Sequence, residues 1–227
     1  MTTTAIIQAR LGSTRLPGKV MLPIAGMPML QRIVRRVERS AVDEIVIATT
    51  TKVEDDAIIQ LARHLQVRTY RGSSDDVLNR YWCAAREVKA DMVVRITADC
   101  PFVFPSIIDE VVGALRTADF ASNAVEPRTF PKGCDVEVMQ MDTLERINRM
   151  ATSPNAREHV CTFIYLERPD LFVIHEVKDR DDHSTISWTV DTMGDYKRMK
   201  LLAERVAVSL EHDYRAMLKA DLDTIVV

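Results

Sequence analysis

The sequence predicts an α/β protein in which helices cover both faces of a mostly parallel central sheet. In the first half of the chain, four short apolar runs rich in β-branched residues each precede a segment with helical periodicity. This repeated order is typical of parallel strands joined by crossover helices. Of the 227 residues 47% are hydrophobic, which is enough to bury a full core, and we expect one domain over residues 1–227.

The four strand and helix pairs follow one another up to residue 118. We expect strands at 4–9, 44–50, 66–71 and 91–98, each followed by a helix, at 28–40, 54–65, 74–89 and 105–118. In the first helix the apolar residues recur at helical spacing and leave four polar positions, Gln31, Arg32, Arg35 and Arg36. We expect these arginines to form a solvated face.

The second half of the chain is less regular. We expect strands at 120–125, 132–141, 171–177 and 184–192, and helices at 142–150, 155–168, 194–207 and 213–220. Pro127, Pro131 and Gly133 indicate a loop. The strand at 132–141 is then a small extended excursion from the main sheet.

The composition excludes several classes of function. The formal net charge is −3, from 30 basic and 33 acidic residues, which gives no overall attraction to nucleic acid or to an anionic membrane. No apolar run reaches the roughly 18 residues needed to span a bilayer, and the first residues lack the pattern of a signal peptide, so we expect a cytoplasmic protein. The four cysteines form no CxxC pair and the five histidines no HxH or HExxH motif, so a metal would depend on carboxylates.

The loop after the first strand, ARLGSTRLPGK, combines glycines with cations. Backbone N–H groups near Gly12 and Ser13 can surround an anion, and the side chains of Arg10, Arg15 and Lys19 add positive charge. The loop is therefore suited to several phosphates. The alternative is a basic surface loop that binds nothing.

Two well-known nucleotide motifs do not fit this loop. The ATPase phosphate loop has four residues between its glycines and a hydroxyl residue after its lysine, whereas here five residues separate Gly12 from Gly18 and Val20 follows Lys19. The GxGxxG motif of dinucleotide-binding proteins is absent as well.

Carboxylates follow two further predicted strands. Asp99 comes directly after the strand at 91–98, and Asp191 ends the run at 184–192. Ligands of α/β proteins bind beyond the carboxyl ends of the strands, and two carboxylates there suit Mg²⁺. The alternative for Asp99 is a helix cap, but it lies several residues before the helix expected at Pro105. Thr192 or Asp195 can cap the last long helix and leave Asp191 free.

The segment IIQARLGSTRLPGKVML resembles the signature loop of the cytidylyltransferases that make CMP-activated sugar acids. These are the CMP-Kdo synthetases and the CMP-sialic acid synthetases, and the similarity is greatest to their spore-coat polysaccharide, SpsF-like branch. The segments RGSSDDVLNRY, TADCPF, FPKGCDVEV, AREHVCTFIY and WTVDTMGDY also resemble motifs of that branch, in the same order. The resemblance implies a Rossmann-like nucleotidyltransferase fold and a homodimer, with the strand at 132–141 reaching the partner.

The resemblance also implies roles for individual residues. The first loop would hold the triphosphate of CTP through Arg10, Gly12, Ser13, Arg15 and Lys19. Asp99 and Asp191 would bind Mg²⁺, and Arg71 and Arg80 would lie in the base and ribose pocket, although Arg80 could equally be a helix-surface residue. Among these, the catalytic residues would be Arg10, Arg15, Lys19 and Asp99.

The acceptor site is expected in the second half of the chain. The resemblance places Glu137, Arg157 and His159 there, and Arg157 could pair with a carboxylate or phosphate of the acceptor. No acceptor-carboxylate motif typical of the Kdo or the sialic acid enzymes is present, so the sugar stays unassigned.

These expectations describe a magnesium-dependent cytidylyltransferase of polysaccharide or glycan biosynthesis. An oxygen of an acidic sugar or sugar derivative would attack the α-phosphate of CTP, and pyrophosphate would leave. The alternatives are a sugar-1-phosphate nucleotidylyltransferase that uses another nucleoside triphosphate, and a non-catalytic protein that binds a nucleotide sugar.

Overall fold

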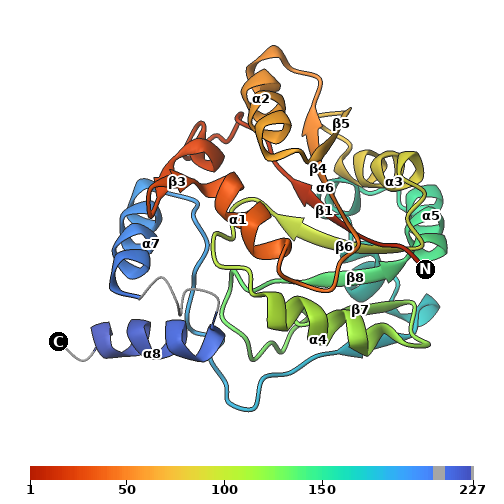
Figure 1. Cartoon of the computed structure of the whole chain (residues 1–227). Helices are drawn as coiled ribbons and strands as arrows, with labels where there is room; N and C mark the ends of the chain where they lie inside the picture. Colours follow the sequence, from red (N-terminus) through yellow and green to blue (C-terminus); the bar gives the residue numbers. More distant parts are fainter. Residues whose placement is uncertain (207–212, 226–227) are drawn as a thin grey trace.

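The protein, seen in a computed structural model that describes residues 1–206 and 213–225, has a seven-stranded sheet at its centre (Figure 1). The strands lie in the order β5-β4-β1-β6-β8-β7-β9. Strand β8 is antiparallel to β6 and β7, and the other neighbours are parallel, which confirms the mostly parallel sheet. The strands of this sheet are β1 (Thr3–Gln8), β4 (Glu44–Thr50), β5 (Arg68–Gly72), β6 (Met92–Thr97), β7 (Phe120–Ser122), β8 (Glu137–Gln140) and β9 (Ile174–Glu176).

Helices cover both faces of the sheet because successive residues of a buried strand point to opposite sides. In β1, Ala5 and Ile7 belong to one core cluster and Ile6 to the other. The first cluster packs against α1 (Met29–Val37), α2 (Asp56–Leu65), α4 (Pro105–Leu115), α7 (Met193–Arg205) and α8 (Tyr214–Ile225). The second packs against α3 (Val77–Glu87), α5 (Met141–Met150) and α6 (Pro154–His159).

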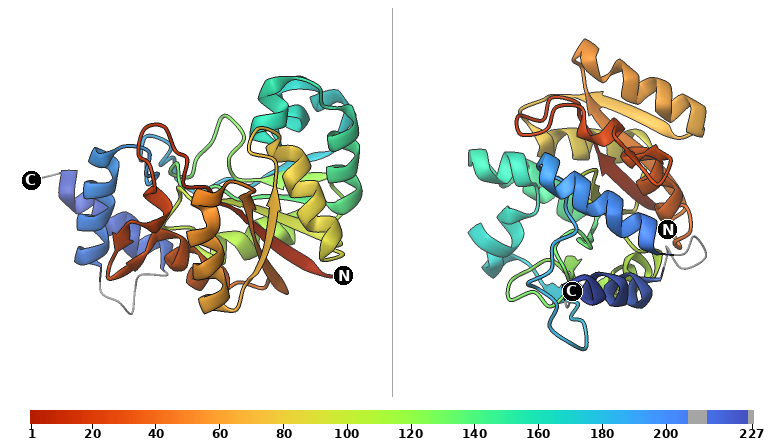
Figure 2. Two further views of the ribbon diagram at one scale, coloured as in Figure 1. Left: turned by 90° about the horizontal axis from the view of Figure 1, so that it is seen from above. Right: turned by 90° about the vertical axis from the view of Figure 1, so that its left-hand side faces the viewer.

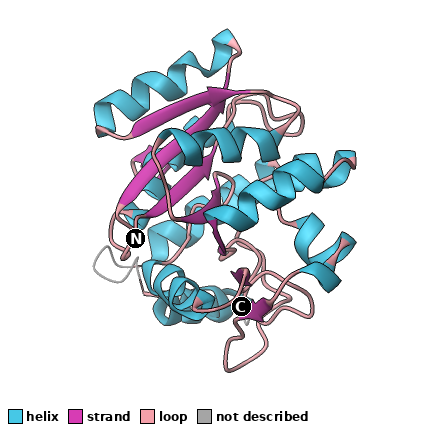
Figure 3. Cartoon of the chain, turned by 90° about the vertical axis from the view of Figure 1, so that its right-hand side faces the viewer, coloured by secondary structure: helices cyan, strands magenta, loops and turns pink. Residues whose placement is uncertain are grey.

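The remaining elements are short. A hairpin of β2 (Pro23–Ile24) and β3 (Met27–Pro28) follows the first loop. Helices α7 and α8 lie together at one end of the molecule, and α5 and α6 lie at the opposite end (Figure 2). Figure 3 shows the strands enclosed between the helical layers. Among the residues described, none of the helices has the length and apolar character needed to cross a membrane.

The prediction of a solvated arginine face on α1 is wrong for two residues. Arg32 and Arg36 are buried, at 2% and 1% exposure. The guanidinium of Arg36 lies 4.6 Å from the ring centre of Phe104, and its Nε donates a hydrogen bond of 2.7 Å to the carbonyl oxygen of Val103. Arg35 alone follows the expectation, since it is exposed and pairs with Glu38. The loop after β6 thus supplies the partners of Arg36, and the helical periodicity of α1 alone could not predict these contacts.

Within residues 1–206 and 213–225, the predicted strand at 184–192 is an extended segment that forms one isolated bridge. Lys132 and Ser187 form that bridge, and the backbone N–H of Trp188 donates a hydrogen bond of 2.6 Å to the carbonyl oxygen of Lys132. Gly133 has a φ of 97°, and a Cβ there would lie 2.7 Å from the carbonyl carbon of Trp188. The close approach therefore requires glycine.

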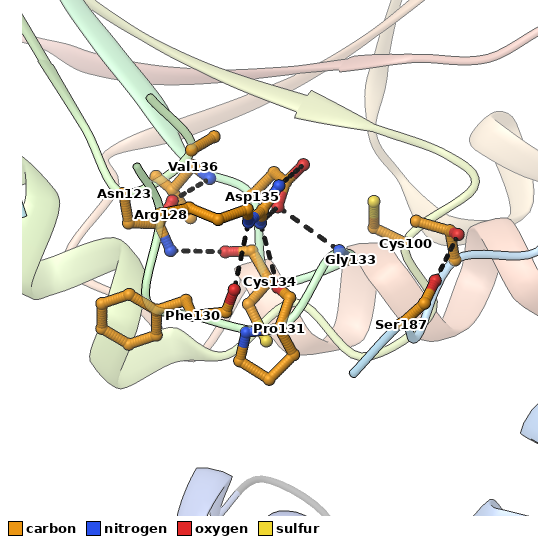
Figure 4. A network of polar contacts seen from close by, with 12 residues as sticks. Cys100, Asn123, Arg128, Phe130, Pro131, Gly133, Cys134, Asp135, Val136 and Ser187 are labelled. Atoms are coloured by element: carbon orange, nitrogen blue, oxygen red, sulfur yellow. Dashed lines mark hydrogen bonds and ion pairs between the residues drawn. The ribbon is translucent and has the colours of Figure 1, made fainter. Parts of the chain in front are cut away.

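The excursion predicted near Pro127 and Gly133 folds back onto the sheet. Arg128 is buried, donates hydrogen bonds to the carbonyl oxygens of Phe130 and Pro131, and forms an ion pair with Asp135 (Figure 4). The strand that follows, β8, is paired with β6 on one edge and β7 on the other. Strand β8 is therefore an interior strand of the sheet.

The helix predicted at 155–168 is interrupted. Helix α6 ends at His159, and a turn of π-helix occupies Phe163–Glu167. The helix predicted at 194–207 is α7, and residue 207 lies outside the described residues.

Candidate active site

The first loop is held in shape by hydrogen bonds at Leu11. The buried carboxylate of Asp55 accepts a hydrogen bond of 2.7 Å from the Leu11 N–H, and it also accepts from the backbone and hydroxyl of Thr50. The carbonyl oxygen of Leu11 accepts from the N–H groups of Ser13 and Gly18, at 2.8 and 2.9 Å. The Ser13 N–H is thus used within the loop, and the expected anion cradle does not include it.

Lys19 lies between the carboxylates of Asp99 and Asp191. Its Nζ lies 2.9 Å from Oδ1 of Asp191 and 3.5 Å from Oδ2 of Asp99, and it donates a hydrogen bond of 2.8 Å to the carbonyl oxygen of Val190. Arg15 approaches the same Oδ1 of Asp191 at 2.9 Å. The loop cations and both strand-end aspartates therefore form one charged cluster.

The two aspartates are positioned by backbone contacts between distant segments. The N–H of Val190 donates a hydrogen bond of 2.8 Å to the carbonyl oxygen of Asp99, which joins the extended segment to the end of β6. The hydroxyl of Thr97 donates to Oδ1 of Asp99 at 2.6 Å. Burial raises the pKa of the Asp99 carboxyl, but the nearby Lys19 and the Thr97 hydrogen bond outweigh burial, so that the pKa is lowered. Asp99 is therefore ionised at neutral pH.

The capping role predicted for the residues after Asp191 is confirmed. The hydroxyl of Thr192 accepts a hydrogen bond from the Asp195 N–H, and the Asp195 carboxylate accepts from the Thr192 N–H. This reciprocal pair begins α7 and leaves the Asp191 side chain to the cluster around Lys19.

A cavity of about 370 Å³ opens beside this cluster at the carboxyl ends of β1 and β6. The first loop, Asp99 and Asp191 line it together with residues of β1 and β6 and the last turn of α6. Its lining residues are Gln8, Ala9, Arg10, Ser13, Thr14, Arg15, Lys19, Val20, Arg95, Thr97, Ala98, Asp99, Glu158, His159 and Asp191.

Most of the predicted loop residues lie at this cavity. Arg10, Ser13, Arg15 and Lys19 line it, and Nη1 of Arg10 lies 3.5 Å from the carbonyl oxygen of Ser74. Gly12 does not line it. A Cβ at Gly12 would lie 2.8 Å from Oε1 of Glu54, the end of a flexible side chain that can move aside.

The structure places the two arginines expected at the base outside the cavity lining. Arg71 donates to the carbonyl oxygens of Thr50 and Lys52 and pairs with Asp56. Arg80 is fully buried, its Nη1 donates to the carbonyl oxygen of Ser73, and burial lowers its pKa. Arg71 thus holds the segment between β4 and α2, and Arg80 supports the turn between β5 and α3.

Of the three residues expected at the acceptor, only His159 lines the cavity. Arg157 directs its guanidinium away, to both carboxylate oxygens of Asp76 and to oxygens of Asn148 and Ala151. It therefore joins α6 to α3 and α5.

Glu137 is buried, does not line the cavity, and forms an ion pair with Arg95, its register partner on β6. Burial disfavours the charged form of Arg95, but the attraction of Glu137 outweighs burial, and the pKa of Arg95 is raised. Of this ion pair, Arg95 lines the cavity, whereas the sequence had indicated Glu137.

Five polar lining residues were not anticipated, namely Gln8, Thr14, Arg95, Thr97 and Glu158. The sequence carries one signal for three of them. Gln8 ends β1, and Arg95 and Thr97 are polar residues two positions apart in an otherwise apolar strand. Polar side chains on a buried strand need a partner or a ligand.

The backbone after His159 is strained. Val160 has φ 59° and ψ −71°, and the N–H of Cys161 donates a hydrogen bond of 2.6 Å to the carbonyl oxygen of His159. This is a γ-turn of the rare kind with positive φ, and its central residue is β-branched. Strain of this kind costs on the order of 1–3 kcal/mol and concentrates at functional sites. The strained turn ends α6 directly after His159, which lines the cavity.

Comparisons with known proteins agree with this geometry. The profile of a family described as cytidylyltransferase matches residues 4–201. The spore coat polysaccharide biosynthesis protein SpsF of Bacillus subtilis is 35% identical over 208 residues, which cover 88% of this chain and 85% of that protein.

Two solved structures are similar over most of this chain. A cytidylyltransferase from Leptospira borgpetersenii superposes with a TM-score of 0.94 and 31% identity, over 100% of this chain and 96% of its own. A CMP:2-keto-3-deoxy-manno-octonic acid synthetase complexed with CTP has a TM-score of 0.68 and 18% identity, over 90% of this chain and 99% of its own. The family profile spans most of the chain, and the protein therefore belongs to the cytidylyltransferase family and is a nucleotidyltransferase.

Proposed function

We propose that this protein transfers CMP from CTP to an acidic sugar or sugar derivative, with release of pyrophosphate, in the biosynthesis of a surface polysaccharide or glycan. The observation that carries the proposal is the convergence of Arg15, Lys19, Asp99 and Asp191 at one end of the cavity. Cations that can hold a triphosphate thus lie beside carboxylates that can hold a divalent metal. The comparison with SpsF supports the polysaccharide context.

The chain's own residues divide the work of nucleotidyl transfer. Arg10, Arg15 and Lys19 would bind the triphosphate, with the hydroxyl of Ser13 as a further donor. An acceptor oxygen forms a bond to the α-phosphorus, and the bond from that phosphorus to the bridging oxygen of pyrophosphate breaks. Arg15 and Lys19 stabilise the negative charge that builds up on the leaving pyrophosphate. His159, which lines the cavity, would accept the proton of an acceptor hydroxyl.

The donor set fits Mg²⁺. Members of this family generally use a divalent metal. Oxygens of Asp99 and Asp191 both face the ammonium group of Lys19, so the two carboxylates share one cation position. Among residues 1–206 and 213–225, no third His, Cys, Asp or Glu joins them, and phosphate oxygens and water would complete the ligands. When bound, the ion neutralises phosphate charge and makes the acceptor hydroxyl more acidic.

The proposal includes an assembly and a compartment. We propose that residues 1–227 form one domain, that the protein is a homodimer, and that it acts in the cytoplasm without binding nucleic acid or membrane. The free thiols of Cys83, Cys100, Cys134 and Cys161 are consistent with a reducing compartment. Light scattering tests the dimer, and a monomeric mass would contradict it.

Two measurements test the reaction. First, the melting temperature is compared with CTP, UTP, ATP or GTP in the presence of Mg²⁺, because a ligand that binds the folded state raises it. We expect the largest rise with CTP. Second, pyrophosphate release is followed with CTP, Mg²⁺ and a panel of 2-keto sugar acids and sugar phosphates. A larger shift with another triphosphate, or no pyrophosphate with any acceptor, would contradict the proposal.

A further inference from the structure

The ammonium group of Lys19 occupies the position between the two carboxylates that we propose hold the metal. Three oxygens lie close to its Nζ, namely the carbonyl oxygen of Val190 at 2.8 Å, Oδ1 of Asp191 at 2.9 Å and Oδ2 of Asp99 at 3.5 Å. The side chain of Lys19 is only 11% exposed, so these oxygens replace most of the water around the ammonium group. A Mg²⁺ ion binds its oxygen ligands at about 2.0–2.1 Å and cannot share this position with the ammonium group.

The cations of the first loop already neutralise the two carboxylates. Lys19 contacts both of them, and Nη2 of Arg15 lies 2.9 Å from Oδ1 of Asp191, the same oxygen that Lys19 contacts. Two positive side chains thus face two negative ones, and the four together carry no net charge. A divalent ion that joined this cluster would lie beside two cations, and their repulsion would oppose its binding.

The protein offers few further ligands at this position. The hydroxyl of Thr97 donates to Oδ1 of Asp99 at 2.6 Å, and Oδ2 is the oxygen that faces Lys19. Within residues 1–206 and 213–225, no three side chains of His, Cys, Asp or Glu are grouped so that they could hold a metal ion. In nucleotide-dependent sites Mg²⁺ usually takes one or two carboxylates, and substrate phosphates and water supply the other ligands. The side chains therefore form only part of a metal site, and Lys19 fills its cation position.

We infer that Lys19 keeps divalent metal out of the nucleotide-free protein, and that the triphosphate admits the metal by drawing Lys19 away from the two aspartates. The inference rests on the proposed function, because it assumes that Lys19 binds the triphosphate. Phosphate oxygens offer the ammonium group new charged acceptors, and they also supply the ligands that the two carboxylates lack. Metal and nucleotide binding are then coupled through one side chain, and the coupling is equal in both directions. The metal therefore binds with the nucleotide or after it.

The experiment measures the binding of Mn²⁺ to the nucleotide-free protein by electron paramagnetic resonance of the free ion. Mn²⁺ takes the same kinds of oxygen ligand as Mg²⁺. We expect Lys19→Met to bind Mn²⁺ about tenfold more tightly than the natural protein, since the ion no longer displaces a charged hydrogen-bonding group. Arg15→Met should change the affinity in the same direction but less, because the Arg15 side chain is 65% exposed. This second variant tests the inference even if Lys19→Met does not fold.

Three controls locate the effect. Lys19→Arg keeps a cation beside the carboxylates and should bind Mn²⁺ no more tightly than the natural protein. Lys200→Met, on the exposed face of α7, should also leave the affinity unchanged. Adding Asp99→Asn to Lys19→Met should abolish the gain, because one of the two carboxylates is then missing. A gain that survives in this double variant, or equal affinity of the natural protein, Lys19→Met and Arg15→Met, would overturn the inference.

The role of the triphosphate is tested by repeating the Mn²⁺ titrations with CTP. CTP itself binds Mn²⁺ in solution to the same extent in each sample, so the comparison is between the natural protein and Lys19→Met. We expect CTP to tighten Mn²⁺ binding by a factor about tenfold larger in the natural protein, and equal factors would show that Lys19 does not couple the two ligands. These measurements need neither turnover nor an acceptor sugar. Their failure is therefore distinct from a failure to release pyrophosphate, which would contradict the proposed reaction instead.

Discussion

Lys19 Nζ lies 2.9 Å from Oδ1 of Asp191, a residue 172 positions later in the chain, and 3.5 Å from Oδ2 of Asp99. The side chain of Lys19 is 11% exposed, so water screens these contacts only in part. The lysine thus separates two carboxylates that would otherwise repel each other. It also belongs to the loop that we propose holds the triphosphate, and this gives one residue two measurable effects.

Replacing Lys19 with methionine should weaken CTP binding. The substitution keeps the apolar part of the side chain and removes the charge that both carboxylates and the triphosphate share. Since a hydrogen bond to a charged group contributes about 1.5–3 kcal/mol, we expect the Kd for CTP to rise by roughly 10- to 100-fold. Calorimetry measures the affinity. Lys200→Met, on the exposed face of α7, is the control and should bind CTP normally, and an unchanged Kd in Lys19→Met would contradict the assigned role.

The lowered pKa of Asp99 predicts how the stability depends on pH. A carboxyl whose pKa is lower in the folded state stabilises the fold above its unfolded pKa of about 3.9, and this stabilisation is lost as the pH falls through the folded value. Asp99→Asn has no such group. Denaturant titrations from pH 2.5 to 6 should show a steeper loss of stability below about pH 4 in the natural protein than in the variant. If the stability of the natural protein and that of Asp99→Asn changed with pH in the same way, the pKa of Asp99 would not be lowered.

Replacing Asp55 with asparagine should loosen the first loop. The buried carboxylate accepts hydrogen bonds from Leu11 and from the backbone and hydroxyl of Thr50, and an amide group cannot accept all of them. We expect the free energy of unfolding to fall by about 2–3 kcal/mol and the KM for CTP to rise. Asp56→Asn is the matched control, because Asp56 is half exposed and its pair with Arg71 contributes about 1 kcal/mol or less. Equal effects of the two substitutions would contradict the special role of Asp55.

The strained turn at Val160 predicts that glycine is more stable than alanine at this position, the reverse of the usual order. At an ordinary position glycine is less stable than alanine, by about 0.5–1 kcal/mol in regular structure. At Val160 the φ of 59° favours glycine, so Val160→Gly should be more stable than Val160→Ala although both lose the buried side chain. Urea unfolding of the two variants measures the difference. The usual order, with alanine the more stable, would show that the turn is not strained.

The ends of the predicted strands were the most informative part of the sequence. Asp99 and Asp191 each follow a β-like run, and the loop cations follow β1. Parallel strands end at the same edge of a sheet, so the apolar runs favour a site where Asp99 lies near the loop cations, whereas Asp191 joins them from an extended segment outside the sheet order. The same pattern, which has the period of buried strands and helices, determined the α/β class.

Only the tertiary structure decided which charged residues face the cavity. Arg71, Arg157 and Glu137 have the residue types that bind substrates, but each is engaged by a partner, and Asp76 and Arg95 are 81 and 42 positions away from theirs. A charged side chain takes its role from the group that compensates it, and nothing in local sequence periodicity specifies a contact across that distance. The apolar pattern therefore determined the fold, and the pairing of buried charges determined which of the charged side chains line the cavity.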